Sequence, residues 1–562
     1  MNKIWKLYET DLNSVEELIK TFNIDSLIAT ILVNRQITQK DKIETFLNPT
    51  RDSFYNPFLL QDMSKAVERI IKAKNNKEKI LIYGDYDVDG ITSITVLKKF
   101  LDENGLETSY YIPKRLEEGY GLNRAAIDKI NKQGYKLMVT VDCGISAIDE
   151  IDYAKTLGIE VIVTDHHEPL NKLPNALAII DPKRELSKYP FRELAGVGVV
   201  FKLIQAICEK QSLNQNEYLK YLDLVCIGTI SDIVPLIDEN RVIAKLGLKL
   251  LQVTKNIGLR SIINVSGYKL LDSNTISFGI GPRINACGRL GHQQEALNLF
   301  LTDNLELARQ ISEKLDKYNR ERQALEKTIY QDAIKQINEE KIQDLNSIVL
   351  CNDKWHHGVI GIVSSKITEL YYKPTILICF EQDIGKGSGR SIQGFDLHNA
   401  LCKCSNYLEK YGGHEMAVGL SIKKENYSHF KKEFERILDN SNIKELQQVI
   451  YIDKEINLKE INLDIVKSLK ILEPFGEANR IPIFLIKNLK INSIRSLSEG
   501  KHLKLTLKQG NIIINCIGFN MGESSNEYSI DTQIDVVANL EINTYNGTES
   551  IQLNLKDIRK SL

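Results

Sequence analysis

Acidic and histidine side chains directly follow short apolar stretches at four places in the sequence. These segments are Asp85-Tyr86-Asp87-Val88-Asp89-Gly90, Asp142-Cys143-Gly144, Asp165-His166-His167 and Ser231-Asp232. So many carboxylates cannot remain ionised together in one cleft without a cation, because like charges at close range raise one another's pKa. Oxygen ligands combined with one imidazole favour Mn²⁺ or Mg²⁺ over a structural zinc ion. The sequence therefore predicts a site for two divalent cations.

The stretches before these clusters have the composition of buried strands. Short β-branched runs at 80–83, 137–141, 161–163 and 178–180 alternate with segments of helical periodicity such as 92–101. This alternation predicts an α/β domain built on a parallel sheet. Ligands bind at the carboxyl ends of the strands in open α/β sheets. We therefore expect the clusters to converge at one edge of the sheet although they lie far apart in the sequence.

The first cluster has the features of a catalytic loop. Asp85, Asp87 and Asp89 alternate, which offers ligands to more than one cation. Gly90 permits a tight turn into a helix that we expect to begin near Ile91, and the partial positive charge of a helix N-terminus suits a phosphate. Alone, such a segment would also indicate a calcium-type loop or an acid that caps a helix. The other three clusters favour the catalytic interpretation.

The two adjacent histidines at a strand end can serve different partners. His166 is expected to bind metal and His167 to contact substrate, although a satisfied structural histidine stays an equal alternative for His167. Acid should inhibit the site, because metal ligation requires ionised carboxylates and a neutral imidazole. An ordinary histidine titrates at about pH 6.5, so we expect protonation of His166 to contribute to this inhibition.

The chain of 562 residues divides into segments of different character. Residues 303–350 contain no Gly or Pro and place Ala308, Ile311 and Leu315 at helical spacing, which predicts a long helix. Near the C-terminus, alternation as in Leu503-Lys504-Leu505 predicts a small antiparallel β domain, either a barrel or a sandwich. The expected parts are an N-terminal helical segment (1–55), an α/β catalytic domain (56–302), a connector helix (303–345), a second α/β domain (346–445) and the β domain (446–562).

Composition is that of an ordinary globular protein, with 43% hydrophobic and 26% charged residues. A formal net charge of −1 neither indicates nor excludes a polyanionic partner, because a local basic groove can be offset elsewhere. The nine cysteines are scattered, and the closest pair, Cys402 and Cys404, has one residue between them, so neither a disulfide framework nor a zinc knuckle follows. No stretch of about 18 apolar residues and no signal-peptide pattern occurs. We expect a cytoplasmic protein without a membrane anchor.

The Asp165-His166-His167 triplet, preceded by the clusters at 85–90 and 142–144, resembles the DHH phosphoesterase superfamily. The segments 281–289 (Gly-Pro-Arg-Ile-Asn-Ala-Cys-Gly-Arg), 355–361 and 412–414 narrow the resemblance to its bacterial exonuclease branch that is specific for single-stranded DNA. The similarity runs from about Lys79 to the end of the chain. It implies a DHH domain, a long helix, a DHH-associated domain and a terminal oligonucleotide-binding (OB) fold.

The same resemblance implies an activity. The implied activity is that of a 5′→3′ exonuclease that uses two Mn²⁺ or Mg²⁺ ions to hydrolyse single-stranded DNA to 5′-mononucleotides, in DNA repair and recombination. We expect a monomer that acts with a helicase and a single-strand-binding protein. Two alternatives are a small-substrate DHH phosphoesterase, acting on oligoribonucleotides, cyclic dinucleotides or pyrophosphate, and a catalytically silent single-strand-binding protein. The added β domain argues against the first, and the complete set of motifs argues against the second.

The resemblance also assigns roles to individual residues. The implied metal ligands are Asp85, Asp87, Asp89, Asp142, His166 and Asp232. Asp142 would bridge the two ions, and the catalytic set would be Asp142, Asp165, His166 and His167.

Substrate contacts are expected from three further segments. Arg115 and a turn at 387–391 that carries Ser388 and Arg390 resemble the family's grip on a terminal 5′-phosphate, for which arginine forks and exposed N–H groups are suited. Arg115 could instead form a surface ion pair. Arg283, Asn285 and Arg289 would clamp phosphates, or tie their loop to the connector helix. His414 would approach the nucleic-acid backbone, or cap a helix.

Overall fold

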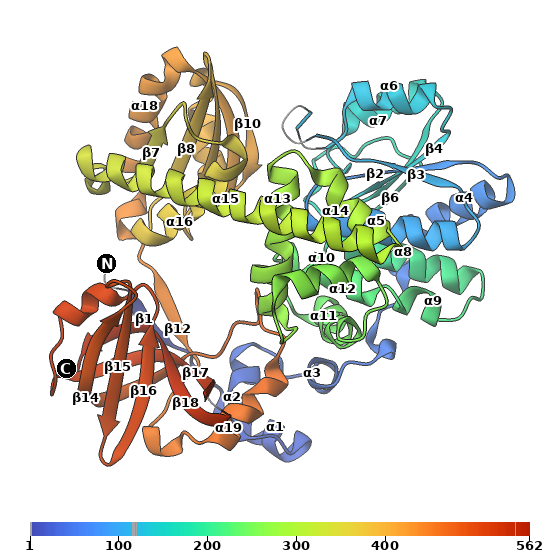
Figure 1. The fold of residues 1–562 in the computed structure, drawn as a ribbon. Helices are drawn as coiled ribbons and strands as arrows, with labels where there is room; N and C mark the ends of the chain where they lie inside the picture. The colour runs from blue at the N-terminus through green and yellow to red at the C-terminus, as the bar shows by residue number, and fades with distance from the viewer. Residues whose placement is uncertain (1–2, 115–117, 120, 546, 562) are drawn as a thin grey trace.

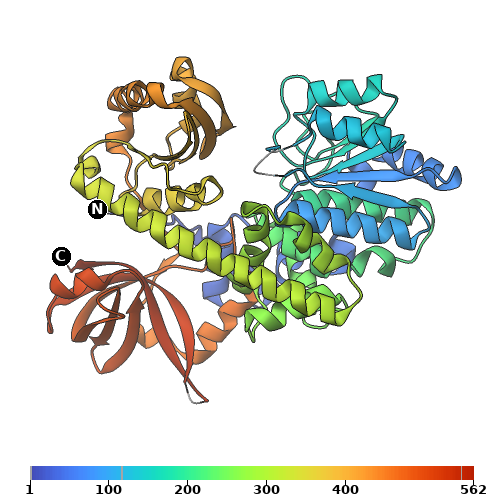
Figure 2. The same ribbon diagram turned by 45° about the horizontal axis from the view of Figure 1, so that its top comes forward.

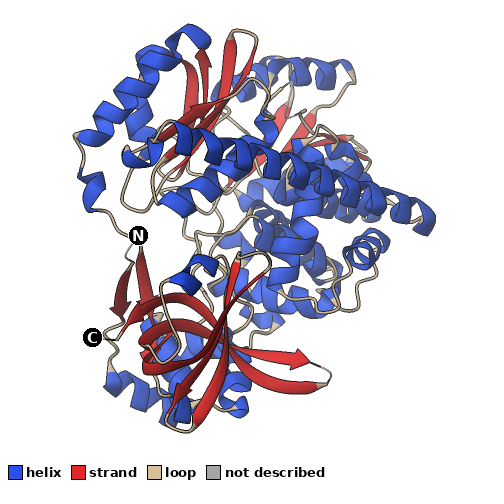
Figure 3. Ribbon diagram, turned by 60° about the vertical axis from the view of Figure 1, so that its left-hand side comes forward, coloured by secondary structure: helices blue, strands red, loops and turns tan. Residues whose placement is uncertain are grey.

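The strands of the protein form three larger sheets in different parts of the molecule (Figures 1 and 3). The computed structural model describes residues 3–114, 118–119, 121–545 and 547–561, and the expected phosphate ligand Arg115 lies outside them. No helix among these described residues combines the length and the apolar character needed to cross a membrane. The expected class, two α/β domains joined by a long helix and a small β domain, is confirmed.

The first domain is built on a parallel sheet. Its strands are β2 (Ile80–Gly84), β3 (Thr108–Tyr111), β4 (Leu137–Val141), β5 (Glu160–Thr164) and β6 (Ala178–Ile180), in the order β3-β2-β4-β5-β6. Ile80 and Ile82 pack on one face of the sheet, and Leu81 and Tyr83 pack on the other, because side chains alternate along a strand. Both faces are therefore buried, which explains the continuous apolar runs in the sequence.

Helices cover both faces of this sheet. Those on one face are α4 (Met63–Asn75), α5 (Val88–Glu103) and α8 (Gly196–Lys210), and those on the other are α6 (Arg124–Lys132) and α7 (Ile148–Thr156). The sequence predicted a start near Ile91, but α5 begins at Val88. The Asp87 side chain caps the helix there by accepting the Gly90 N–H. Asp89 therefore lies in the first turn of α5.

A layer of helices follows the sheet and packs against α5 and α8. It consists of α9 (Asn216–Leu219), α10 (Leu222–Ser231), α11 (Asp238–Leu251), α12 (Ile257–Ser266), a π-helical turn (Thr275–Ile280), α13 (Gly281–Arg289) and α14 (Gln293–Leu301). α10 lies beside α5 and α11, and Asp232 is the residue that ends it. This layer thereby brings a residue from outside the sheet to the carboxyl ends of the strands.

The connector is helix α15 (Leu305–Glu339), which crosses from the first domain to the second (Figures 1 and 2). Ala308 and Leu315 near its start belong to the hydrophobic core of the first domain. Ile329 and Ile337 near its end belong to a cluster of the second domain. The first half of the helix thus packs in the core of the first domain and the second half in a core of the second domain. The helix ends at Glu339, a few residues before the expected 345.

The second domain has a mixed sheet in the order β10-β11-β9-β8-β7. Its elements are β7 (Ile348–Cys351), α16 (His357–Tyr371), β8 (Thr375–Glu381), β9 (Ile384–Arg390), α17 (Leu397–Lys403), β10 (Leu408–His414), β11 (Ala417–Lys423) and α18 (Tyr427–Asp439). The expected turn at 387–391 is wrong, because 387–390 form the end of β9. Gly387 and Gly389 suit a strand there since the side chains of Leu420 and Val418 fill the space of a Cβ.

The C-terminal domain is a closed barrel, which decides between the two β architectures left open by the sequence. Its strands are β13 (Lys454–Glu455), β14 (Phe484–Leu497), β15 (His502–Gln509), β16 (Ile512–Gly518), β17 (Gln533–Tyr545) and β18 (Thr548–Lys560), with α19 (Leu463–Ser468) before β14. β14 pairs with both β15 and β17, which closes the sheet on itself.

The N-terminal segment packs on this barrel. It consists of β1 (Ile4–Leu7), α1 (Leu12–Phe22), α2 (Ser26–Asn34) and α3 (Lys40–Leu47). β1 pairs in parallel with β12 (Val449–Ile452), immediately before the barrel. Leu27, Ile31 and Phe46 share one hydrophobic cluster with barrel residues such as Leu505 and Val536. The two ends of the chain therefore build one folded unit, and both termini lie on that side of the molecule (Figure 1).

Candidate metal centre

The register of the parallel sheet brings the three strand-end clusters together. Gly84 at the end of β2 pairs with Val141 at the end of β4, and Val141 pairs with Thr164 at the end of β5. The residues that follow these three are Asp85, Asp142 and Asp165, so they leave the sheet at the same edge. The expected convergence of the clusters is present in the structure.

Asp89 is held by backbone groups from a distant helix. Its buried carboxylate accepts the N–H of Gly196 at 2.6 Å and that of Val197 at 2.8 Å, at the start of α8. Gly90 beside it lies against the main chain, because an added Cβ would be 2.5 Å from the Asp85 carbonyl oxygen. The sequence interpretation did not include the Gly196-Val197 pair, and two glycines at the start of a helix, Gly196 and Gly198, were the signal for it.

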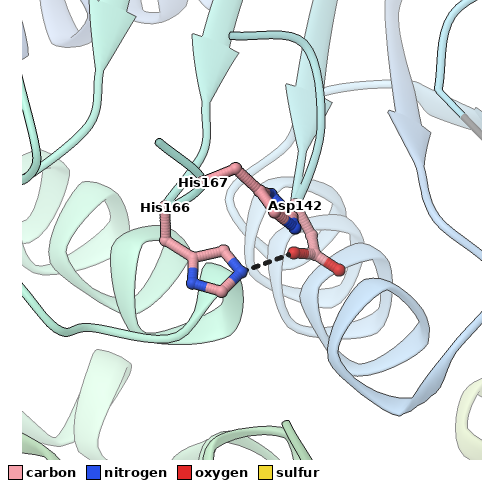
Figure 4. Close-up of side chains that lie close together, drawn as sticks. All are labelled: Asp142, His166 and His167. Carbon is pink, nitrogen blue, oxygen red and sulfur yellow. Dashed lines mark ion pairs between the residues drawn. The ribbon is translucent and has the colours of Figure 1, made fainter. Parts of the chain in front are cut away.

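Asp142 adopts a left-handed backbone conformation, with φ of 58°. Asp and Asn enter this region more readily than other non-glycine residues. The Asp142 N–H donates to the Thr164 carbonyl at 3.0 Å, so the residue remains tied to β5. Its carboxylate Oδ1 lies 3.1 Å from Nε2 of His166 (Figure 4). The end of β4 thus presents its carboxylate to the histidine that follows β5.

His166 Nε2 occupies the middle of the acidic cluster. Besides the Asp142 contact, it lies 3.8 Å from Asp89 Oδ2 and 3.7 Å from Asp232 Oδ2. It is buried and makes no hydrogen bond to a described atom. A buried imidazole nitrogen that faces three carboxylates without a hydrogen bond is the arrangement expected of a metal ligand.

The ligand atoms form three groups, and the atoms of each group all lie within 4.8 Å of one another. They are Asp142, His166 and His167; Asp89, His166 and Asp232; and Asp85, Asp87 and Asp142. Asp142 and His166 each belong to two groups, so neighbouring ions could share a ligand. The six residues expected as ligands from the sequence all take part, and this oxygen-rich set fits two divalent cations of the Mn²⁺ or Mg²⁺ type.

Asp165 lies beneath these groups and contacts His167. It is 1% exposed, and its carboxylate accepts the Ile145 N–H at 2.9 Å and lies 2.7 Å from His167 Nδ1. Burial lowers the pKa of His167, but the hydrogen bond and charge of Asp165 outweigh it, and the pKa is raised overall. Asp165, which the sequence placed in the catalytic set, therefore holds the ring of His167 at Nδ1 and belongs to none of the three ligand groups.

The pKa values of three carboxyl groups are raised because they are buried close to other carboxylates. Burial, followed by the charge of Asp87, raises the pKa of Asp89 to about 7. Burial and neighbouring carboxylates raise the pKa of Asp142 and of Asp232 well above the ordinary value. Burial lowers the pKa of His166 to about 3. The expectation that His166 contributes to acid inhibition is therefore wrong, since its ring stays neutral through the mildly acidic range and the carboxylates titrate instead.

These pKa directions predict how pH and metal affect stability. Above the ordinary Asp pKa of about 3.9, these three carboxyl groups hold more protons in the folded metal-free protein than in the unfolded chain, so their contribution to the free energy of unfolding falls as pH rises. The lowered pKa of His166 acts in the opposite direction below about pH 6.5, but it is one group against three. The loss should run from about pH 4 through about pH 7, the pKa of Asp89. Bound cations offset the repulsion. Calorimetry of EDTA-treated protein should therefore show a larger rise of Tm with Mn²⁺ at pH 8 than at pH 5, and equal rises would contradict the raised pKa values.

The segment of α13 expected to clamp phosphates makes three different contacts. Arg283 is bound by Asp316 of α15 at 2.9 Å, which is the structural alternative that the sequence left open. The Asn285 side chain accepts the Val88 N–H at 3.3 Å, beside the first cluster. Arg289 donates to the Gly358 carbonyl at the start of α16 at 3.0 Å. Asn285 and Arg289 also line a large cavity, whereas Arg283 is not among its lining residues.

The expected phosphate and backbone contacts of the second domain lie on its sheet. Arg390 Nη1 donates to the Ser388 hydroxyl at 3.2 Å on β9. Gly361 of α16 approaches both side chains, since an added Cβ would lie 2.9 Å from Ser388 Oγ. His414 is exposed at the end of edge strand β10, so the helix-capping alternative is wrong.

Comparison with known proteins supports this architecture. The family model for the DHH family, N-terminal domain matches residues 79–229, that for the DHHA1 domain matches 344–440, and that for the RecJ OB domain matches 452–557. The chain is 36% identical over 559 residues to the single-stranded-DNA-specific exonuclease RecJ of Bacillus subtilis, covering 98% of this chain and 70% of that protein. The chain belongs to the RecJ family. The resemblance stated from the sequence motifs is thereby confirmed.

Other RecJ proteins match with similar coverage. RecJ of Haemophilus influenzae is 35% identical over 537 residues, which cover 90% of this chain and 92% of that protein. The crystal structure of RecJ from Thermus thermophilus in complex with Mn²⁺ has a TM-score of 0.87 at 28% identity and covers 100% of this chain and 80% of that chain. Its complex with Mg²⁺ gives 0.82 at 27% identity, with 79% of that chain covered.

Proposed function

We propose that this protein is a metal-dependent exonuclease that hydrolyses single-stranded DNA in the 5′→3′ direction to 5′-mononucleotides, in DNA repair and recombination. The observation that carries the proposal is the convergence of five carboxylates, His166 and His167 in three overlapping ligand groups at the sheet edge of a RecJ-family chain. A catalytically silent binding protein would not need this complete set.

The residues present define the roles in hydrolysis. Two Mn²⁺ or Mg²⁺ ions held by these ligands would lower the pKa of a water molecule and neutralise charge on the phosphate. Asp142, shared by two groups, would be a ligand of both ions. His167, kept in place at Nδ1 by Asp165 at 2.7 Å, would lie near the scissile phosphate. Burial of Asp89, Asp142 and His166 limits the access of bulk water to these groups.

A large cavity provides room for a strand. It has a volume of about 1740 Å³, whereas sites for small ligands measure about 300–1,000 Å³. It is lined from the first domain, the connector, the second domain and the barrel by residues that include Asn285, Arg289, Lys327, Lys366, Lys501 and Phe519. Cationic side chains with an exposed aromatic ring suit a single-stranded polyanion. This lining favours long DNA over the small-substrate alternative.

Digestion of end-labelled strands tests this function. With Mn²⁺ or Mg²⁺, 5′-labelled single-stranded DNA should release labelled mononucleotide at once, while the 3′ label should remain on long products until late. Blunt duplex of the same sequence should be cut much more slowly. Preferential hydrolysis of a dinucleotide over the long strand would favour the small-substrate phosphoesterase, and binding without hydrolysis under either metal would favour the silent binding protein.

The cellular setting is part of the same proposal. All nine cysteines are free thiols, which agrees with a reducing compartment, and we place the protein in the cytoplasm. A helicase would supply single strands, and a single-strand-binding protein would keep them open. We propose that the protein acts as a monomer, because one chain supplies the complete ligand set.

A further inference from the structure

A segment at the start of the barrel lies against the loop that carries a metal ligand. We call residues 472–479 the clasp and residues 232–237, between α10 and α11, the ligand loop. The Leu236 N–H donates to the Glu477 carbonyl at 2.8 Å. Gly476 packs so closely on Leu236 that an added Cβ would lie 2.5 Å from its Cδ1. The clasp therefore contacts the ligand loop through both main chain and side chain.

The ligand loop needs support from outside. Ile233, directly after the ligand Asp232, has φ of 62° and is 71% exposed. The left-handed region is unfavourable for a β-branched residue, and such a conformation persists only where surrounding contacts determine it. The exposed Ile233 side chain supplies little packing. The loop is held at its other end by the contacts of Leu236 with the clasp and by the Asn240 side chain, which donates to the Pro235 carbonyl at 3.0 Å.

Arg241 on α11 holds the clasp in this position. It is 1% exposed, and its guanidinium donates only to main-chain oxygens, at 2.8 to 3.3 Å. The acceptors are those of Phe46, Ile471, Leu472, Glu473 and Pro474. A planar group with five N–H donors can serve so many acceptors at once, and a lysine cannot.

The clasp is also closed on itself. The fully buried Asn479 donates to the Leu472 carbonyl at 2.9 Å and to the Pro474 carbonyl at 2.7 Å. A second contact reaches the first domain, since the Ser273 hydroxyl donates to the Phe475 carbonyl at 2.6 Å. The clasp is thus a closed loop, and the position in which Arg241 holds it also fixes its contact with Leu236.

We propose that Arg241 is a positioning residue for the metal centre. By holding the clasp against the ligand loop, it keeps Asp232 in reach of the ions, so the barrel takes part in building the site as well as in contacting the strand. This inference rests on the proposed function only in taking Asp232 as a metal ligand. Mn²⁺ binding measured without DNA therefore separates the two, because a chain that binds Mn²⁺ normally and cleaves nothing would fail the proposed function alone.

The first experiment replaces Arg241→Met in the full chain, which removes the donors and keeps a long side chain. Calorimetric titration with Mn²⁺ should show affinity reduced by about 10-fold or more, as for loss of groups that support metal ligands. Amide exchange of the 232–237 segment in metal-free protein should accelerate. Lys245→Met is the matched control: one turn along α11, Lys245 donates to Leu47 and Ile471, outside the clasp, and its loss should leave Mn²⁺ affinity unchanged.

The second experiment acts on the clasp and leaves Arg241 intact. Gly476→Ala places a methyl group against Leu236, and the backbone of Gly476 is not left-handed, so the contact alone causes the effect. Mn²⁺ affinity should fall, and the double variant Gly476→Ala with Leu236→Ala should regain part of it because the clashing atoms are gone. If Arg241→Met does not fold, this pair still tests the contact of the clasp with the ligand loop, through which Arg241 would act.

The alternative is that Arg241 and the clasp only tether the barrel to the first domain, and this tether would give a different result. It would weaken binding of long DNA in the folded variants while Mn²⁺ affinity and amide exchange of the ligand loop stayed at wild-type values. That result overturns the positioning role, and so does the absence of rescue in the double variant when Gly476→Ala has reduced Mn²⁺ affinity.

Discussion

Asp142→Asn should abolish hydrolysis while leaving the protein folded. Asn has the same shape and tolerates the left-handed backbone of this position, but it removes a charge from the residue that two ligand groups share. Metal ions contribute several kcal/mol of charge stabilisation in such reactions, so we expect turnover to fall by about 10³-fold or more. Release of mononucleotide under saturating Mn²⁺ measures the effect, and near wild-type turnover would remove Asp142 from its bridging role.

The same substitution should stabilise the metal-free protein. Burial and the charges of Asp89, Asp87, Asp232 and Asp85 raise the pKa of Asp142, so this carboxyl group destabilises the folded metal-free protein at neutral pH and Asn does not. Thermal unfolding in EDTA should therefore give a higher Tm for Asp142→Asn than for wild type. Asp149→Asn, at an exposed position in α7, is the control and should change neither property. An inactive variant with lower stability would indicate general misfolding.

Gly196→Ala is expected to have the second-largest effect. An added Cβ would lie 2.7 Å from both Cβ and Oδ1 of Asp142, and the Gly196 N–H also binds Asp89 at 2.6 Å. Either the carboxylate of Asp142 or the start of α8 must move. A shift of about 1 Å at a reacting centre can cost about 10²-fold in rate, and we expect a loss of this size in kcat.

The control for this substitution lies two residues along the same helix. At Gly198 an added Cβ would be 3.4 Å from its nearest neighbour, Leu194 Cδ2, which is ordinary van der Waals contact. Gly198→Ala should therefore preserve kcat and raise Tm slightly, because Ala favours the helix. Equal losses of activity in both variants would show that the helix start, and not its contact with Asp142, matters.

The sequence predicted the first sheet well because each buried strand has a local signal. The apolar runs ending at Gly84, Val141 and Thr164 are buried on both faces, and their order along the chain placed the clusters at one edge. Strand β3 was missed because its residues, Thr-Ser-Tyr-Tyr, form a short edge strand without a continuous apolar run. Local pattern also misplaced the start of α5, which depends on the side chain of Asp87.

Contacts between distant segments could not be predicted from one sequence. The bonds from Gly196 and Val197 to Asp89 join residues more than a hundred positions apart. The binding of Arg283 by Asp316 was left open as an alternative, because an arginine in a glycine-rich segment has no local feature that identifies its partner. The pKa of His166 could not be predicted from the sequence either, because its lowering depends on burial in the fold. Burial lowers this pKa to about 3.

The shared core of the N-terminal helices and the barrel has a consequence for synthesis on the ribosome. Leu27, Ile31 and Phe46 leave the exit tunnel early, but the barrel strands that cover them follow only after residue 484. At roughly 5–20 residues per second, this delay lasts about 20–90 s. During translation the apolar side chains of these helices therefore stay without their barrel partners until the barrel strands have been made.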